Sequence, residues 1–245
     1  MASRADRSPL PPAPRLGSVL RQAGIDFYFQ SIRLVLANGA WGTCLIGVLV
    51  VGMVAGPLPA LVLTPLLAVP ASGVFRLAAL VARDEPPDFS DVTDAWRQLA
   101  PLSLAVGVVL TLAGVVLGFD LLGAIGSGSP VAWAFATMAG WGLLAVACYS
   151  TVAWPLLVDP RRESRSVGNR LRLAVIVLAA FPVRVLSLTV IIGVVLLLST
   201  IAFAALLSIS LAYVALVSCR YVLPAADRLE ARVAAVRQGA SGRTG

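Results

Sequence analysis

The stretch that decides the fold is residues 34–75, LVLANGAWGTCLIGVLVVGMVAGPLPALVLTPLLAVPASGVF, in which no charged residue occurs. A membrane-spanning helix needs about 20 mainly apolar residues, so this run is long enough for two spans. The sequence Gly56-Pro57-Leu58-Pro59 near its middle predicts a tight turn. We therefore expect one span at about 34–56 and a second at about 60–82.

The composition of the whole chain agrees with a membrane protein. Of its 245 residues, 59% are hydrophobic and only 13% are charged, and the mean hydropathy is +0.91. Soluble domains carry roughly 25% charged residues. A soluble fold must keep its outside wetted, whereas a lipid-facing surface does not. The chain is therefore expected to form an all-α, polytopic transmembrane bundle.

Four further apolar runs predict a total of about six spans. They cover about 99–119, 131–157, 184–202 and 203–220. No Gly or Pro marks the turn between the last two. Residues 173–183 are too few to cross a membrane, and a span at 173–197 would place Arg184 in lipid at a cost of a few kcal/mol. We therefore expect an interfacial amphipathic helix near 166–181.

The ends of the chain are polar. Residues 1–15 are rich in Pro and charge, which predicts a disordered cytoplasmic tail. Residues 16–223 then form a single transmembrane domain, whose first part, 16–33, is an interfacial lead-in. Residues 224–245 are expected to form a cytoplasmic tail with a short helix at about 225–238.

The arginines predict the orientation. All 19 basic residues are Arg, and they fall in the N-terminal segment, in or beside the loops after spans two and four, and in the C-terminal segment. Arg76 lies just inside the end of span two, and Arg184 lies at the start of span five. The turns near 57, 125 and 202 contain none. Because basic residues collect in cytoplasmic loops, both termini should be cytoplasmic, in a bacterial cell membrane.

No set of residues predicts catalysis. The chain has no His and no Lys, which removes the commonest general base, metal ligand and Schiff-base residue. Cys44, Cys148 and Cys219 lie in apolar runs without C-x-x-C spacing and are interpreted as small buried hydrophobes. The arginines flank apolar runs, which favours lipid headgroups over nucleic acid. We expect no enzymatic activity, no cofactor and no metal.

Three polar residues in or beside the spans are the candidate functional positions: Asn38, Asp120 and Arg184. Asn38 lies one turn inside span one, where an amide either holds helices together or contacts a polar ligand. Asp120 is the only charged residue on the predicted outer half, so it is either functional or an interfacial carboxylate. Arg184 begins the fifth span.

Two other patterns have structural interpretations. Five carboxylates lie at Asp84, Glu85, Asp88, Asp91 and Asp94. Their spacing does not match a magnesium-dependent phosphotransferase, and we expect Asp91 to cap a helix that begins near Val92. Small residues at Gly107, Thr111, Gly114 and Gly118, and at Gly52 and Gly56, predict close helix packing, within one chain or between copies.

The chain resembles the YesL-like family of uncharacterised bacterial integral membrane proteins. The resemblance rests on Asn38-x-x-Trp41, on Leu63-Thr64-Pro65 with Ala68-Val-Pro70-Ala71, on Ala95-Trp96-Arg97, and more loosely on Trp154-Pro155 and Pro182-Val-Arg184. The family has no established activity, and its members are often encoded near carbohydrate-uptake systems.

The resemblance and the lack of catalytic residues together give a functional expectation. We expect the protein to be an accessory or regulatory partner of a solute (carbohydrate) uptake system, of the ABC type. Two alternatives stay open. One is a small-molecule transporter, because Pro59, Pro65 and Pro70 predict a broken second span. The other is a structural protein that organises the membrane by packing with lipid and with itself.

Overall fold

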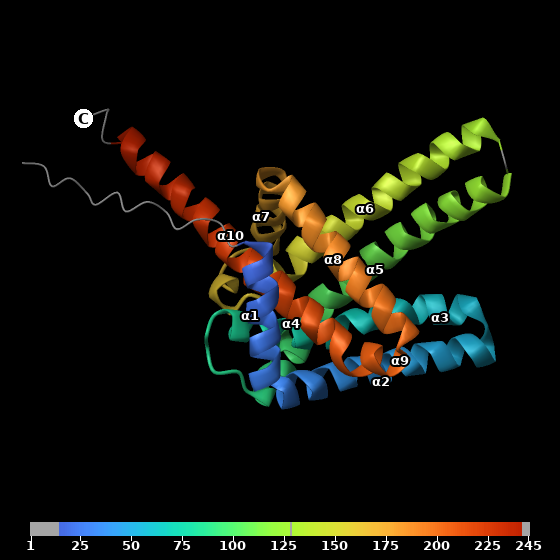
Figure 1. Cartoon of the computed structure of the whole chain (residues 1–245), viewed down its shortest axis with the longest axis horizontal. Coiled ribbons are helices and arrows are strands. Elements are labelled where there is room, and N and C mark those ends of the chain that lie inside the picture. The colour runs from blue at the N-terminus through green and yellow to red at the C-terminus, as the bar shows by residue number, and fades with distance from the viewer. Residues whose placement is uncertain (1–14, 128, 242–245) are drawn as a thin grey trace, which may run out of the picture.

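The computed structural model describes residues 15–127 and 129–241, which are almost entirely helical and contain no strand (Figure 1). Six helical segments in this part of the chain are long and apolar enough to cross a membrane. They are Ser31–Ala55, Pro57–Ala82, Phe89–Gly126, Pro130–Val158, Pro182–Ile201 and Leu207–Ala235. The protein is a multi-pass helical membrane protein, and the all-α prediction with six spans is confirmed.

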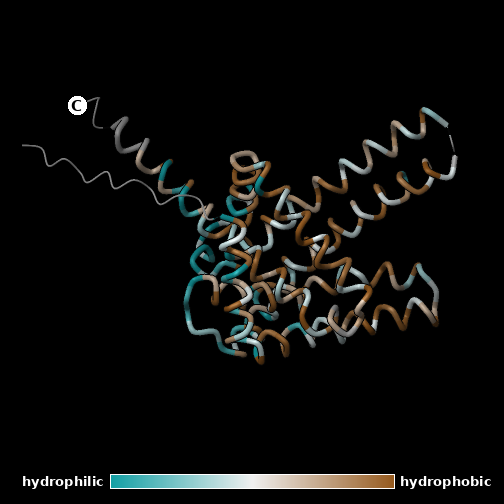
Figure 2. Tube along the Cα trace, viewed as in Figure 1, coloured by the Kyte–Doolittle hydropathy of each residue, from teal (hydrophilic) through white to brown (hydrophobic). Residues whose placement is uncertain are grey.

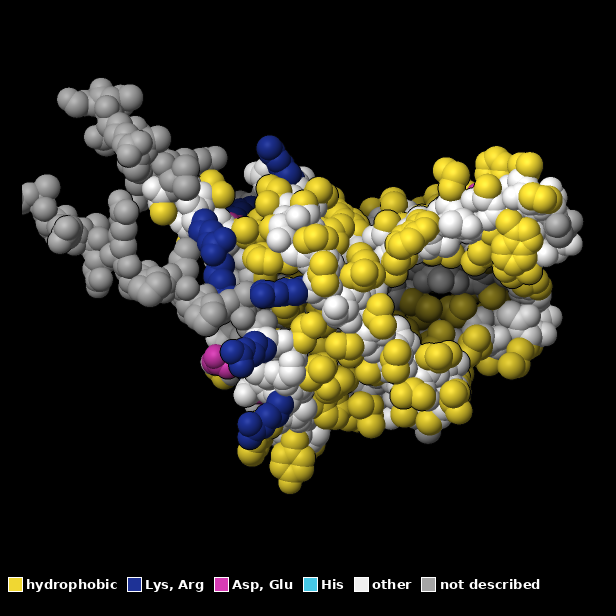
Figure 3. Space-filling view, turned by 45° about the horizontal axis from the view of Figure 1, so that its top comes forward, with side chains coloured by type: hydrophobic (Ala, Val, Ile, Leu, Met, Phe, Trp, Pro, Cys, Tyr) yellow, Lys and Arg dark blue, Asp and Glu magenta, His cyan; other side chains and the backbone are white. Residues whose placement is uncertain are grey.

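The bundle has a polar end and an apolar end. The α2–α3 hairpin (Ser31–Ala55 and Pro57–Leu63) and the α5–α6 hairpin (Phe89–Ser127 and Pro130–Val158) diverge toward the right of Figure 1. Hydrophilic residues gather at the opposite end, on the left of Figure 2. The arginines visible in Figure 3 lie at that same end. We call it the Arg-rich end.

The second span is broken into three pieces. Gly56, with φ of 94°, makes the predicted turn, because a positive φ strains residues that have a Cβ. After α3, a 3₁₀ turn, η1 (Thr64–Leu67), contains Pro65, and α4 (Ala68–Ala82) follows. Pro65 has no N–H to donate to the helix, so the chain tightens there. The 3₁₀ turn interrupts the α-helix of this span, as the prediction of a broken second span expected.

The start of α5 corrects one prediction. This helix begins at Phe89, three residues before the predicted start at Val92. Asp91 is therefore inside the first turn and is not the cap. Its carboxylate accepts the backbone N–H of Asp88 at 2.8 Å, as the third helical residue does in a capping box. Asp88 directly precedes the helix and therefore takes the capping position.

The short helix predicted between spans four and five is present. It is α7 (Val167–Ala180), and the hydroxyl of Ser166 accepts the N–H of Asn169 at its start. Fourteen residues span only about 21 Å, which is too short to cross a bilayer. Phe181 and Pro182 end it and begin α8 (Pro182–Ile201). Figure 1 shows α7 and α1 (Leu16–Phe29) running across the direction of α2 at the Arg-rich end.

The last span differs from the prediction in two ways. After Ala202 the chain forms α9 (Phe203–Ala205) and a π-helical turn, η3 (Leu206–Ser210), before α10 (Leu211–Ser241). The helix then continues through Pro224, so the predicted tail helix is the extension of the last span. Pro224 has no N–H to donate, so the hydrogen-bond ladder of α10 lacks one bond there.

The hydrophobic core lies toward the Arg-rich end. Of the six spans, the one that contains α10 is the most deeply buried, and it packs against α1, α4 and α6. Leu77, Leu156, Leu216 and Tyr221 are almost fully buried there. The two hairpins, by contrast, expose large apolar side chains along most of their length, as expected of surfaces that face lipid.

Candidate functional site

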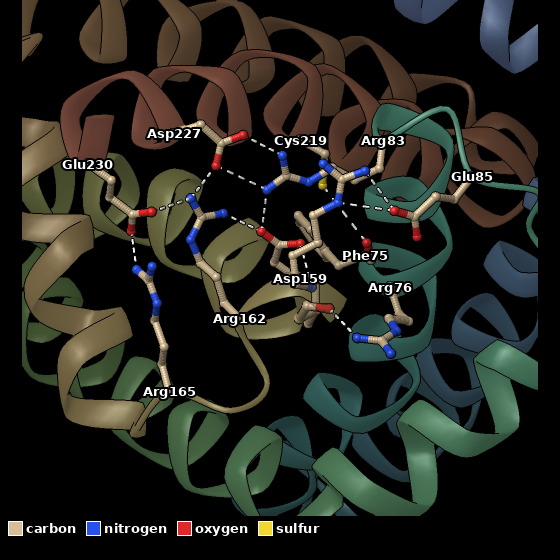
Figure 4. A network of polar contacts seen from close by, with 12 residues as sticks. Phe75, Arg76, Arg83, Glu85, Asp159, Arg162, Arg165, Cys219, Asp227 and Glu230 are labelled. Carbon is tan, nitrogen blue, oxygen red and sulfur yellow. Dashed lines mark hydrogen bonds and ion pairs between the residues drawn. The ribbon is translucent and has the colours of Figure 1, made fainter. Parts of the chain in front are cut away.

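A network of buried ion pairs crosses the Arg-rich end (Figure 4). Its centre is Asp159, which follows α6 and is fully buried. The Asp159 carboxylate accepts a hydrogen bond from Arg83 Nη2 at 2.6 Å and another from Arg162 Nη1. It also accepts the backbone N–H of Arg161 at 3.2 Å, which starts the 3₁₀ turn η2 (Pro160–Arg162). One carboxylate thus joins the end of α4 to the loop after α6.

The network continues onto α10. Asp227 accepts hydrogen bonds from both Arg83 and Arg162, and Glu230 accepts from Arg162 and Arg165. The network therefore contains three guanidinium groups and three carboxylates. This balance of charge lets the charged groups be buried, because each has an opposite partner within hydrogen-bond distance.

Burial and ion pairing shift the pKa of the network's arginines in opposite directions. Burial alone would lower the pKa of Arg83, but hydrogen bonds from its guanidinium to Asp227 and Asp159 outweigh burial and raise it. Burial likewise opposes the charge of Arg162, and the nearby charges of Asp159, Glu230 and Asp227 raise its pKa. Both side chains stay charged, so the network is held by full charges.

Other arginines at the same end donate hydrogen bonds to backbone carbonyl oxygens. Arg170 donates to the carbonyl oxygen of Leu157 at 2.6 Å and Arg76 donates to that of Val158 at 2.9 Å. These carbonyls belong to the last turn of α6, where helix oxygens have no intrahelical partner. Arg220 of α10 pairs with Asp26 of α1 at 2.7 Å and with Asp84 at 2.9 Å. Arginines thus tie α1, α4, α6, α7 and α10 together.

A cavity of about 440 Å³ lies in the middle of the bundle, beneath this network. Each of the six spans contributes to its lining, and most of the lining is apolar. Its polar side chains include five hydroxyl groups, from Thr111, Ser150, Thr151, Thr189 and Ser218. At the Arg-rich side the rings of Phe75 and Trp154 stack with centroids 5.7 Å apart and line the cavity. Figure 4 shows Phe75 beside the ion-pair network.

The hydroxyl of Ser218 is the most informative polar group of the cavity. Its side chain is 1% exposed, and the hydroxyl has no hydrogen-bond partner among the described residues. Ser150 and Thr151, by comparison, donate to carbonyl oxygens of their own helix. Burying an unpartnered hydroxyl costs about 1–3 kcal/mol.

Asn38 holds the π-helical turn in place. Its amide nitrogen donates to the carbonyl oxygen of Leu207 at 2.7 Å, and its amide oxygen accepts the N–H of Ala212 at 2.9 Å. Asn38 is fully buried, and α2 approaches η3 so closely that a Cβ on Gly42 would lie 2.7 Å from the Leu207 oxygen. The Asn38 amide therefore joins α2 to η3 and to the start of α10, which is the helix-to-helix contact expected as one of its two roles.

The other two candidate positions lie apart from both sites. Asp120 is exposed near the end of α5 and forms no ion pair within the described residues. Arg184 is exposed in the first turn of α8, with its guanidinium 6.0 Å from the centre of the Phe181 ring. Neither lines the central cavity.

The cysteines and small residues show a mixed outcome. Cys148 and Cys219 are buried as expected, but Cys44 is exposed on α2, where it would face lipid. A Cβ on Gly107 would lie 2.6 Å from the Pro65 oxygen, so this glycine packs within the chain. Gly114 and Gly118, however, face open space. In the part of the chain that the structure describes, no three Cys, Asp or Glu side chains are placed to hold a metal ion.

Comparison with known proteins adds no further information. No protein-family model matches the chain, and no curated protein or solved structure matches it. The resemblance to the YesL-like family stays a prediction.

The sequence did not indicate the ion-pair network or the cavity. Asp159, Asp227 and Glu230 lie in segments that look like ordinary polar ends of spans, and hydroxyl residues in apolar helices usually bond to their own backbone. One signal was available. Arginines and carboxylates recur at the same end of several spans, so some must meet once the spans are bundled.

Proposed function

We propose that this protein is a membrane transporter for a small, uncharged and mainly apolar molecule, which it binds in the central cavity. The observation that carries this proposal is a cavity at the centre of the bundle, lined by all six spans, with five hydroxyl-bearing residues in its wall. Ligand sites of helical membrane proteins lie between helices in this way, at the depth of the bilayer midplane.

The lining sets the class of the ligand. A cavity of about 440 Å³ is within the usual range for small-molecule sites. It contains hydroxyl groups but no charged side chain, so a charged ligand would lose its hydration without gaining a partner. A sugar would leave most of its hydroxyls unpaired against the apolar wall. The cavity therefore favours an apolar ligand with one or two hydrogen-bonding groups.

The ion-pair network fits the role of a closed gate. It joins α4, the loop after α6, and α10 across the Arg-rich end, directly beyond the Phe75–Trp154 stack. By the distribution of arginines this end is cytoplasmic, as are both termini, in the cell membrane of a bacterium. The surface is hollowed between the two hairpins on the opposite side (Figure 3). The broken second span provides an element that could bend during opening.

Thiol accessibility provides the test. In a protein with Cys44 replaced by Ser, Ser150→Cys places a thiol on the cavity wall, and Thr137→Cys places one on the lipid-facing side of the same helix. N-ethylmaleimide reacts with thiolates, which form only where water enters. Transport predicts labelling of Ser150→Cys, protection when Ser218→Leu fills the cavity, and no labelling of Thr137→Cys. Equal labelling at both positions would contradict the proposal, as would labelling at neither.

A second function, as the accessory partner of an ABC-type uptake system, is supported by one observation. Gly114 and Gly118 of α5 form a small-residue face with open space in front of it. Such faces accept a second helix at close range. We propose that this face binds either a helix of the uptake system or a second copy of the chain. Purification in mild detergent tests this: recovery of the protein alone and monomeric would refute it, and loss of a partner in Gly114→Leu would support it.

A further inference from the structure

A second cavity lies on the outside of the bundle, between α5 and α6, which run side by side in Figure 1. It has a volume of about 310 Å³ and reaches Leu157 of α6 and Leu171 of α7 at the Arg-rich end. Its lining is mainly apolar, and Tyr149 and Ser150 supply its hydroxyl groups. Val109 in its wall is 65% exposed, so the cavity opens at the surface of two membrane spans. We call it the α5–α6 groove.

The groove is a local gap between two helices that pack closely elsewhere. Farther along the same hairpin, a Cβ on Gly142 would lie only 3.1 Å from the side chain of Leu117. On another face of α5, a Cβ on Gly107 would meet the Pro65 oxygen at 2.6 Å, so η1 holds α5 in place. The atoms that line such a gap lack contacts, so a molecule that fills it gains dispersion energy.

The bilayer supplies the molecule that fills this gap. The groove opens on two helices that are long and apolar enough to cross a membrane, and its lining residues carry no charge. At the depth of the hydrocarbon, an exposed apolar surface meets the chains of lipids and the compounds dissolved among them. The groove offers apolar contacts along two helices, which is what a single alkyl chain needs.

The groove and the central cavity share part of their walls. Leu110, Ser150 and Trp154 line both, so the wall at these positions is one residue thick. The hydroxyl of Ser150 donates to the Val146 oxygen of its own helix at 2.8 Å. Leu110 and Trp154 are half-buried, so a change of rotamer can open the wall without moving a helix. The stacking of Trp154 on Phe75, with centroids 5.7 Å apart, favours the closed state.

We propose that the α5–α6 groove is the entrance to the central cavity, through which an apolar molecule with an alkyl chain passes sideways out of the bilayer. Leu110 and Trp154 form the gate of this entrance. The inference rests on the proposed transport function and adds the source of the ligand, which is the hydrocarbon of the membrane. The entrance is separate from the ion-pair network, whose residues do not line the groove.

The test compares two maleimides on a thiol inside the central cavity. In a chain with Cys44 replaced by Ser, Thr189→Cys places this thiol on α8, at a buried residue that lines the cavity and not the groove. N-dodecylmaleimide dissolves in the bilayer, whereas N-ethylmaleimide also reaches the protein from water. Each is applied to the full chain in phosphatidylcholine vesicles, and the rate of labelling at position 189 is measured by mass spectrometry of peptides.

The blocking variant is Ala105→Phe, because Ala105 is exposed and lines the groove but not the cavity. The matched control is Ala134→Phe, which adds the same ring to an exposed position of α6 outside both. We expect Ala105→Phe to slow labelling by N-dodecylmaleimide about tenfold, an added barrier of about 1.4 kcal/mol. Labelling by N-ethylmaleimide should stay unchanged, which also shows that the variant folds. The control should change neither rate, and Leu110→Ala should speed up labelling by N-dodecylmaleimide.

The outcomes separate this inference from the proposed function. If N-ethylmaleimide labels Thr189→Cys but N-dodecylmaleimide does not, the entrance is refuted while the accessible cavity stands. The entrance is equally refuted if Ala105→Phe and Ala134→Phe have the same effect on N-dodecylmaleimide. If neither reagent labels Thr189→Cys, the cavity admits no ligand, and the proposed transport function fails together with its entrance.

Discussion

The charge of Asp159 is the point at which the ion-pair network is most easily tested. The substitution Asp159→Asn keeps the size of the side chain and keeps the oxygen that accepts the backbone N–H of Arg161. It removes only the negative charge between Arg83 and Arg162. Those two guanidinium groups, with side chains 7% and 3% exposed, then share Asp227 as their common carboxylate.

The expected loss follows from burial. Removing one partner of a buried ion pair costs about 3–5 kcal/mol, because the remaining charges are less well compensated in a medium of low dielectric constant. Asp227 still pairs with both arginines, so we expect a loss at the lower end of this range. For a chain of this size each kcal/mol lowers the melting temperature by about 2–4 °C, so we expect a fall of at least about 6 °C. The loss should change little with added salt, since buried pairs are poorly screened.

Thermal unfolding of the purified protein in detergent, monitored by size-exclusion chromatography, measures this fall in melting temperature. The control is Asp94→Asn, which removes an exposed carboxylate without an ion pair in the described structure, and which should change stability by no more than about 0.5 kcal/mol. If Asp159→Asn melts at the same temperature as Asp94→Asn, the network does not stabilise the protein. The network would then not hold the proposed gate closed.

Three further predictions use the same assay. Asn38→Leu leaves the Leu207 oxygen and the Ala212 N–H unsatisfied, so we expect the free energy of unfolding to fall by about 2–4 kcal/mol. The control, Thr43→Val on the same helix, should be nearly neutral. Equal effects of the two substitutions would contradict the role of Asn38. Gly107→Leu should destabilise the protein strongly because its Cβ would meet the Pro65 oxygen, whereas Gly114→Leu should not. Asp120→Asn should leave both stability and cavity labelling unchanged, and a change in either would assign Asp120 a role that its exposed position does not indicate.

The positions of the spans were predictable because lipid imposes a simple rule. Every backbone polar group in the hydrocarbon must be paired, so each long apolar run must be a helix. The break at Gly56 was predictable because only a turn allows two spans within residues 34–75. The start of α5 was not predictable from the sequence, because Asp88 and Asp91 are both good capping residues. Only the placement of Phe89 and Ser90 decides between them.

The π-helical turn before α10 shows a different limit. Nothing in residues 206–210 marks it, since such a turn depends on a partner that satisfies the displaced backbone groups. That partner is Asn38, more than 160 residues earlier in the chain. The sequence identified Asn38 as a polar residue that needs a partner, but the location of that partner is a property of the packed bundle.

By itself, the sequence determined that the chain is a helical membrane protein with six spans, and that its arginines belong to one end. Both follow from the free energy of transferring side chains between water and lipid, which is local to each segment. Only the tertiary structure decided which charges meet. Arg83 and Asp227 are 144 residues apart, and the five hydroxyls of the cavity come from four different helices. Pairing energies depend on distances of a few ångströms between such groups, and those distances exist only once the helices have packed.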